Sequence, residues 1–117
     1  MKKVLVLEDC PDIAEDLEEF LEALGLFVVL LDGPRPDEDY TAYRAAIVDE
    51  GLQGSFGHEV IPLIAEANPD ICLIYIPGSP QREHAEKFSG ILRHFSYQPK
   101  PFSLHRIRKD LEQWELI

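Results

Sequence analysis

Cysteine is scarce in this sequence, with only Cys10 and Cys72 among 117 residues. The two thiols lie far apart and form no pattern of spaced pairs, which excludes a disulfide framework and fits a reducing compartment. Cys72 lies inside an apolar run, so we expect it to pack in the core.

Basic residues are also few, with 11 Lys and Arg against 22 Asp and Glu and a formal net charge of −11. Direct binding to nucleic acid needs a basic footprint, so we expect no nucleic-acid partner. Anionic membrane surfaces are disfavoured for the same reason. A divalent cation or a basic patch on another protein is electrostatically favoured instead.

Long apolar runs are missing as well. The apolar segment near the amino terminus is far too short for a signal peptide or a membrane span, so we expect a soluble, cytoplasmic protein. The length suits one hydrophobic core, and no repeat, low-complexity tract or linker divides the chain. We therefore expect a single domain over residues 1–117.

What the sequence does contain is an alternation of short apolar runs and amphipathic segments. The runs predict strands and the segments predict helices, because apolar residues recur at helical spacing in the latter. The expected strands are 3–7, 27–31, 45–49, 71–76 and 97–98, and the expected helices are 11–24, 38–44, 58–68, 82–95 and 104–114. This order predicts an α/β protein with a doubly wound parallel sheet.

One carboxylate is well placed for chemistry. The apolar run 45–48 leads into Asp49, and Glu50 and Gly51 follow directly. In an open α/β sheet the functional crevice lies at the carboxyl ends of the strands. Many strands end in Asp only to begin a turn, so this signal gains its weight from the other strand ends.

Glu8 and Asp9 end the first strand and Lys100 follows the last, so the fold brings all of them to the edge that holds Asp49. Two like charges at ~4 Å cost on the order of 4 kcal/mol at an effective dielectric near 20, so such a cluster favours a bound cation. Mg²⁺ suits carboxylates and phosphates. An acid that can attack, a magnesium site and a lysine together indicate phosphoryl transfer.

These motifs resemble those of the receiver domain of two-component response regulators, the CheY-like family. Residues 5–9, 47–49 and 100–102 follow the family's order, and Gly57, eight residues after Asp49, matches the glycine that opens its third helix. The resemblance covers the whole chain. It implies a five-stranded parallel sheet of flavodoxin-like strand order 2-1-3-4-5, with a short or irregular second helix.

The resemblance also implies roles for the residues around the phosphoacceptor, which would be Asp49. Asp9 would be the main Mg²⁺ carboxylate and Glu8 would hold a metal-bound water. Gly51 would lend its backbone carbonyl to the metal, and Lys100 would pair with the phosphoryl group.

Three further positions would complete the switch. Glu50 and Gly78 would line the loop that binds the phosphoryl group. Tyr97, three residues before the lysine, matches the aromatic residue whose rotation reports phosphorylation. A plain edge-strand aromatic is an equally good interpretation of Tyr97.

Pro77 is a serious departure from the family, which has Thr or Ser at this position. Proline has no hydroxyl and no N–H, so it cannot donate to a phosphoryl oxygen, and the usual coupling to Tyr97 is broken. The amide of Gly78 remains able to donate.

Two functions therefore stand at this stage. The first is a receiver in phosphorelay signal transduction, which is a switch rather than a turnover enzyme. A sensor histidine kinase or phosphotransfer protein would phosphorylate it on Asp49 with Mg²⁺, and it would act on an unknown downstream protein. The alternative is a phosphorylation-independent pseudo-receiver, an interaction or dimerisation module. A magnesium phosphohydrolase is a distant third, because Gly51 stands where its second acid is needed.

Two expectations concern residues outside this cluster. The last helix, which carries Trp114, is a candidate for homodimer or partner contact. The histidines show no metal-ligand spacing and are expected to be solvated; they are His58, His84, His94 and His105.

Overall fold

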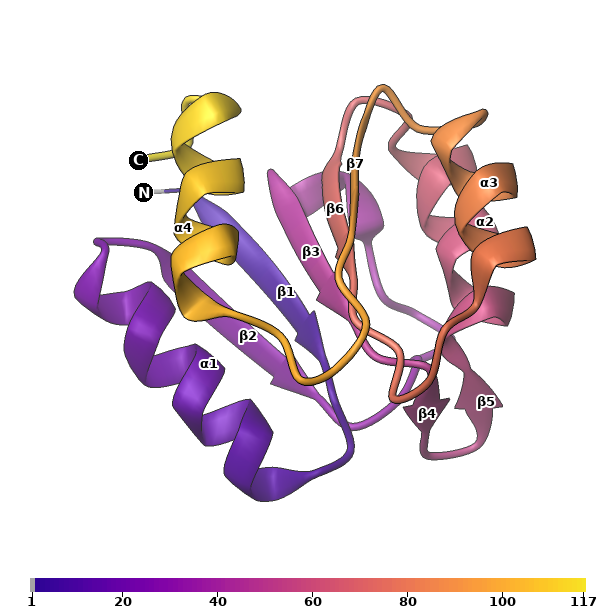
Figure 1. Cartoon of the computed structure of the whole chain (residues 1–117), viewed down its shortest axis with the longest axis horizontal. Helices are drawn as coiled ribbons and strands as arrows, with labels where there is room; N and C mark the ends of the chain where they lie inside the picture. Colours follow the sequence, from indigo (N-terminus) through magenta and orange to yellow (C-terminus); the bar gives the residue numbers. More distant parts are fainter. Residues whose placement is uncertain (1) are drawn as a thin grey trace.

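The computed structural model describes residues 2–117 and is built around a five-stranded parallel sheet (Figure 1). Its strands are β1 (Lys3–Leu7), β2 (Phe27–Leu31), β3 (Ala45–Val48), β6 (Cys72–Tyr75) and β7 (His94–Tyr97). The spatial order of the strands is β2-β1-β3-β6-β7. Because β6 and β7 are the fourth and fifth strands of this sheet along the chain, this confirms the predicted order 2-1-3-4-5. Every residue of β3 and β6 is buried, as expected for central strands covered on both faces.

Four helices cover the two faces of the sheet. Helices α1 (Pro11–Ala23) and α4 (Leu104–Gln113) lie on one face, and α2 (Gly57–Ala67) and α3 (Arg82–Ser89) lie on the other (Figure 1). Within residues 2–117, every helix is too short or too polar to cross a bilayer.

The core consists of two apolar clusters, one on each side of the sheet. Successive side chains of a strand point to opposite faces, so β1 contributes to both clusters. Val4 and Val6 pack with residues of α1 and α4, whereas Leu5 and Leu7 pack with residues of α2 and α3. The continuous apolar runs of the sequence thus serve two layers of helices at once.

The second helix is short and irregular, as expected, but it does not span the predicted range 38–44. The segment forms one 3₁₀ turn, η1 (Tyr40–Ala42), which begins after Asp39. The Asp39 carboxylate accepts the backbone N–H of Thr41 at 3.0 Å, a local bond that competes with a regular helix.

The helix expected over 82–95 also proves too long. It ends at Ser89, because Gly90 begins a turn and Phe95 lies in β7. The final strand, expected at 97–98, accordingly begins earlier, at His94.

The segment after Asp49 was expected to be a loop, but it forms a small antiparallel hairpin of β4 (Gly51–Leu52) and β5 (Ser55–Phe56). Gly54 allows this turn, since its φ is +78°. In α2, Ile61 is fully buried, whereas Leu63 is 55% exposed.

Candidate functional site

Two strand ends carry the central carboxylates of the candidate site. The sheet pairing extends one residue past β1 and β3, because Glu8 N–H donates to the carbonyl of Leu31 at 3.0 Å and Asp49 N–H donates to that of Leu7 at 2.9 Å. The two acids are therefore fixed by the sheet itself, at its carboxyl edge.

The structure brings the three predicted acids together. Glu8, Asp9 and Asp49 each offer a carboxylate oxygen, and these atoms lie within 4.8 Å of one another. Glu8 is 3% exposed and Asp49 is 5% exposed, whereas Asp9 is accessible to solvent. Two ionisable groups thus share a nearly dry position, and such groups need a positive partner.

Lys100 is that partner within the described residues. Its Nζ lies 3.2 Å from Glu8 Oε2 and 3.2 Å from Asp49 Oδ1. It is positioned by the segment after β7, where its N–H donates to the carbonyl of Pro77 at 2.8 Å. The Lys100–Pro101 peptide bond is cis.

The charges of this cluster shift the pKa values of its members. Burial and then the charge of Asp49 raise the pKa of Glu8, and Lys100 offsets part of this effect together with the N–H of Cys10, which donates at 3.2 Å. Burial lowers the pKa of Lys100, but the charges of Asp49 and Glu8 outweigh it, so its net shift is upward. The cluster therefore favours a protonated lysine between two acids.

The residues present fit a magnesium ion. Three carboxylates at one edge supply hard oxygen donors, and the accessible position of Asp9 leaves room for waters and a ligand. One lysine faces two nearly buried acids, so Lys100 only partly balances the buried negative charge. A divalent cation would complete that balance.

Pro77 has no hydroxyl that could contact Tyr97. It is buried two residues past the end of β6. The Tyr97 hydroxyl instead accepts the backbone N–H of Gln81 at 2.6 Å, which ties it to the loop before α3. Gly78 is exposed in that same loop, and its phosphoryl-binding role stays a prediction.

The Glu50 side chain forms hydrogen bonds with two neighbouring residues. Its Oε1 accepts the Tyr75 hydroxyl at 2.6 Å and the backbone N–H of His58 at 2.9 Å. The role of Glu50 in the phosphoryl-binding loop stays a prediction. Gly51 begins β4, and its contribution to a metal stays a prediction.

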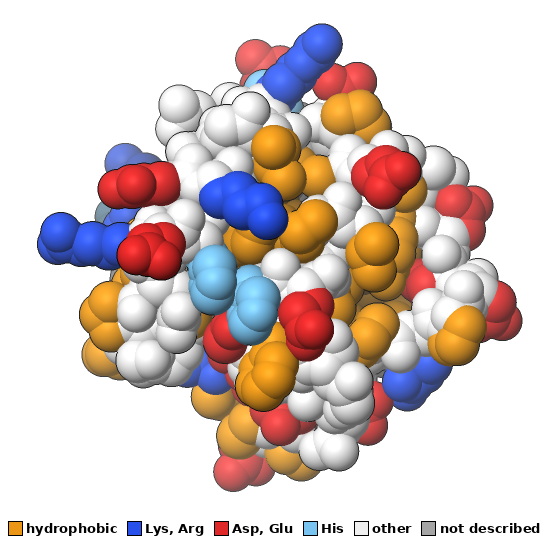
Figure 2. All heavy atoms as spheres, turned by 90° about the vertical axis from the view of Figure 1, so that its right-hand side faces the viewer, with side chains coloured by type: hydrophobic (Ala, Val, Ile, Leu, Met, Phe, Trp, Pro, Cys, Tyr) orange, Lys and Arg blue, Asp and Glu red, His pale blue; other side chains and the backbone are white. Residues whose placement is uncertain are grey.

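The expectation that the histidines are solvated holds for His94 and His105, which are exposed, but is wrong for the other two. His58 and His84 are half-buried and stack beside Glu50, on the face made by α2 and α3, where Figure 2 shows histidine and acidic side chains in contact. Sequence spacing missed this group because 26 residues separate the histidines. The available signal was that each follows a central strand, in the first turn of the next helix.

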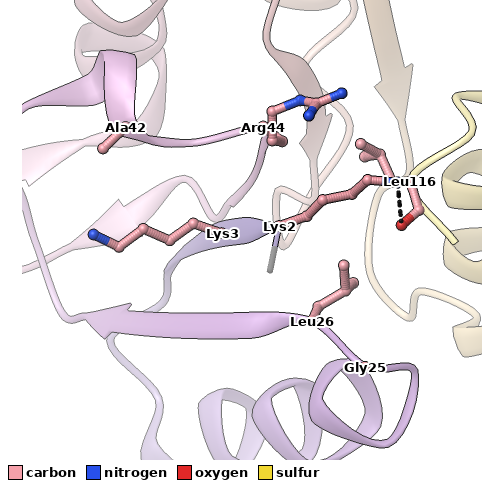
Figure 3. A pocket seen from close by; sticks show the side chains of 7 residues that line it. All are labelled: Lys2, Lys3, Gly25, Leu26, Ala42, Arg44 and Leu116. Atoms are coloured by element: carbon pink, nitrogen blue, oxygen red, sulfur yellow. Dashed lines mark hydrogen bonds between the residues drawn. The ribbon is translucent and has the colours of Figure 1, made fainter.

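A hollow of about 640 Å³ lies at the opposite, amino edge of the sheet (Figure 3). It is lined by basic side chains, among them Lys2 and Arg44, and by the carboxyl-terminal Leu116. Lys2 Nζ donates to the carbonyls of Glu115 at 3.0 Å and Leu116 at 3.3 Å, so this lysine is already engaged. Because the hollow lies at the opposite edge of the sheet, it is separate from the acidic cluster.

No family model matches the sequence, and no curated protein matches it significantly. Solved structures do match. The signal receiver domain of a DNA-binding response regulator from Colwellia psychrerythraea 34H has 20% identity and a TM-score of 0.83, with 100% of both chains covered. The receiver domain of a modulated diguanylate cyclase from Desulfovibrio desulfuricans G20 has 25% identity and a TM-score of 0.75, covering 97% of this chain and 92% of that one.

A third neighbour is a response regulator from Burkholderia pseudomallei, solved with a phosphorylated aspartic acid, a calcium ion and citrate. It has 22% identity and a TM-score of 0.78, covering 95% of this chain and 66% of that one. These similarities extend over nearly the whole chain, as the TM-scores and coverages show, and they concern the fold. The fold of this chain is that of the response regulator receiver domains.

Proposed function

We propose that this chain is a cytoplasmic receiver in phosphorelay signal transduction, with Asp49 as the phosphoacceptor and Mg²⁺ as the cofactor. The observation that carries the proposal is the convergence of three carboxylates on one ammonium group, at the carboxyl edge of the sheet. The phosphodonor would be a sensor histidine kinase or a phosphotransfer protein. The output would be altered binding to a protein partner.

The chemistry would proceed through a carboxylate oxygen of Asp49. That oxygen attacks the phosphorus of the donor, an acyl phosphate bond forms, and the bond from phosphorus to the donor nitrogen or oxygen breaks, with its electron pair leaving on the donor. Bound Mg²⁺ would neutralise charge on the transferring phosphoryl group. Lys100, already 3.2 Å from Asp49, would pair with a phosphoryl oxygen.

One structural neighbour supports the proposed chemistry by its composition. The Burkholderia pseudomallei protein carries a phosphorylated aspartate together with a divalent cation. Glu8, Asp9 and Asp49 supply the same type of chemistry here, carboxylates able to hold a cation beside a nucleophilic acid.

The test is intact-mass measurement after incubation with acetyl phosphate and Mg²⁺. We expect an added mass of about 80 Da per chain, the mass of one phosphoryl group. The addition should disappear in Asp49→Ala and with EDTA, and it should persist in the matched variant Asp70→Ala, which removes an exposed acid. A mass that never changes, together with no binding of beryllofluoride, would refute the phosphoacceptor role.

The second candidate function is a pseudo-receiver that binds a partner or a second copy without phosphorylation. Pro77 favours it, because a buried proline two residues past the end of β6 offers no hydroxyl to follow a phosphoryl group. Amide NMR distinguishes the two. Under the first proposal, beryllofluoride with Mg²⁺ shifts the amides around Asp49; under the second, it leaves them unchanged.

A further inference from the structure

A second cluster of metal-binding side chains lies outside the acidic site, on the face made by α2 and α3. Glu50, His58 and His84 each offer a ligand atom, and these atoms lie within 4.8 Å of one another. The three residues come from three separate places along the chain: the segment between β3 and β4, the first turn of α2 and the first turn of α3. The parallel sheet brings them together, since β3 and β6 are neighbouring strands.

The two imidazole rings are held in place by aromatic stacking. Their centroids are 4.3 Å apart with an interplanar angle of 13°. Phe56 stacks on the outer side of His58 at 5.6 Å, and Phe88 lies beyond His84 at 6.2 Å. The stacking keeps the two rings adjacent, and at least one ring would rotate out of the stack to direct both nitrogens at one ion, because a ring nitrogen binds a metal in the plane of its ring.

Glu50 is oriented by hydrogen bonds. Its Oε1 accepts two hydrogen bonds, from the Tyr75 hydroxyl at 2.6 Å and from the His58 N–H at 2.9 Å. Its Oε2 faces the same cluster and contacts Nδ1 of His58. A carboxylate fixed through one oxygen, with the other directed at an imidazole, has the arrangement that outer-shell partners give to metal ligands.

His84 provides a second observation in favour of a ligand at this cluster. Its Nδ1 is buried and has no hydrogen-bond partner among residues 2–117. A buried polar atom without a partner is costly, and no hydrogen bond at Nδ1 fixes the tautomer of this ring. The imidazole can therefore present a lone pair to a cation without breaking a bond at that nitrogen.

We propose that Glu50, His58 and His84 bind a divalent transition-metal ion, with Zn²⁺ as the reference ion. Two imidazole nitrogens and one carboxylate oxygen form a borderline donor set, which suits zinc-type ions and leaves the fourth position to water. Tetrahedral Zn²⁺ ligands at 2.0–2.1 Å lie about 3.3 Å from one another. The contact between His58 Nδ1 and Glu50 Oε2 would lengthen to this separation. Pairs of ligand atoms that are farther apart, up to the 4.8 Å limit, would approach each other by rotation of their side chains.

The acidic cluster and this site would then select different ions. Glu8, Asp9 and Asp49 offer oxygen donors only, which suit Mg²⁺, whereas the imidazoles favour a softer ion. The net charge of −11 raises the local concentration of any cation. The inference does not rest on phosphorylation of Asp49.

The experiment is a Zn²⁺ titration of tag-free, chelator-treated protein by calorimetry, with excess Mg²⁺ present to occupy the acidic cluster. We expect one Zn²⁺ per chain. His58→Ala and His84→Ala should each weaken binding by at least tenfold, because each removes a direct ligand. His94→Ala and His105→Ala remove exposed histidines and should leave the affinity unchanged.

Tyr75→Phe is a more selective variant, since it deletes only the hydroxyl that orients Glu50. We expect about a tenfold loss of Zn²⁺ affinity with the stoichiometry unchanged. Co²⁺ gives a second readout, because its visible bands report nitrogen ligation and should vanish in His84→Gln.

Three results would overturn the proposal: no stoichiometric Zn²⁺ binding, binding retained in both His58→Ala and His84→Ala, or binding lost in Asp9→Asn, which would assign the ion to the acidic cluster. Far-UV circular dichroism confirms that each variant is folded. If a histidine variant unfolds, Tyr75→Phe and the Co²⁺ spectrum of the native chain decide between binding and its absence.

Discussion

Replacing Lys100 by methionine tests how the buried acidic cluster is held together. Met keeps most of the length and volume of the side chain but removes the ammonium group that lies 3.2 Å from both Glu8 and Asp49. Two nearly buried carboxylates would then face each other without their lysine. We expect the variant to fold but to be clearly less stable at neutral pH.

The size of the loss follows from the geometry. One ion pair at 3.2 Å is worth about 5 kcal/mol at an effective dielectric near 20, before desolvation is subtracted. Removing one partner of a buried pair costs roughly 3–5 kcal/mol. The Lys100 side chain is 20% exposed, so we expect the lower end, about 3 kcal/mol, or a fall in Tm of about 12 °C for a chain of this size.

The pH dependence gives the sharper test. The pKa of Lys100 is raised in the fold, so its stabilisation is complete below the ordinary value of 10.5 and is lost as the pH rises through the folded value. The pKa of Glu8 is raised above 4.5, so ionised Glu8 destabilises the fold at neutral pH, and protonation relieves this as the pH falls. Without Lys100 the Glu8 pKa rises further. The gap between variant and native chain should therefore narrow from neutral toward acidic pH.

Urea unfolding followed by far-UV circular dichroism measures both free energies, at about pH 7 and about pH 5. Lys109→Met is the matched control, because it makes the same chemical change at an exposed position on α4 and should alter stability by less than about 0.5 kcal/mol. A Lys100→Met chain as stable as the native one at neutral pH would refute the electrostatic reasoning, and so would a loss of equal size at both pH values.

Three further changes test other parts of the fold. Burial raises the pKa of Cys72 to about 11, so at pH 8 only about one Cys72 thiol in a thousand is ionised. A thiol reagent should therefore modify only Cys10 in folded protein and both cysteines in urea, and rapid modification of both without urea would contradict this expectation. Gly57→Ala should lower the free energy of unfolding by roughly 1–3 kcal/mol, because the new Cβ would overlap a backbone oxygen. Gly78→Ala is the control, since its Cβ would meet nothing within 4 Å, and equal urea midpoints for the two variants would contradict the expected loss at Gly57. Tyr97→Phe should cost about 1 kcal/mol in urea unfolding, since it removes the acceptor of a loop amide, and an unchanged midpoint would show that water replaces this bond.

The strands were predictable because burial on both faces leaves little freedom of composition. The runs at 3–7 and 27–31 match β1 and β2 at both ends. Helix faces were harder. In α2 both Ile61 and Leu63 are apolar, so periodicity alone does not decide which one turns inward, and the structure buries Ile61.

Short elements escaped prediction for a different reason. The β4–β5 hairpin pairs only two residues on each side, so no alternation pattern has room to develop. The expected helix at 38–44 is shortened by one local bond, from the N–H of Thr41 to the carboxylate of Asp39. A side chain that can cap a turn can also prevent a longer helix, and composition does not distinguish the two.

The two candidate sites differ in how sequence encodes them. Glu8 and Asp49 follow apolar strands directly, so the position of each acid can be inferred from the strand it ends. His58 and His84 lie in the first turns of helices, where the register of the helix decides which way each ring points. Their meeting depends on how α2 and α3 pack across β3 and β6, which periodicity does not specify. A site whose histidines lie at helix starts is therefore visible only once the fold is known, even though its third residue, Glu50, directly follows Asp49 in the sequence.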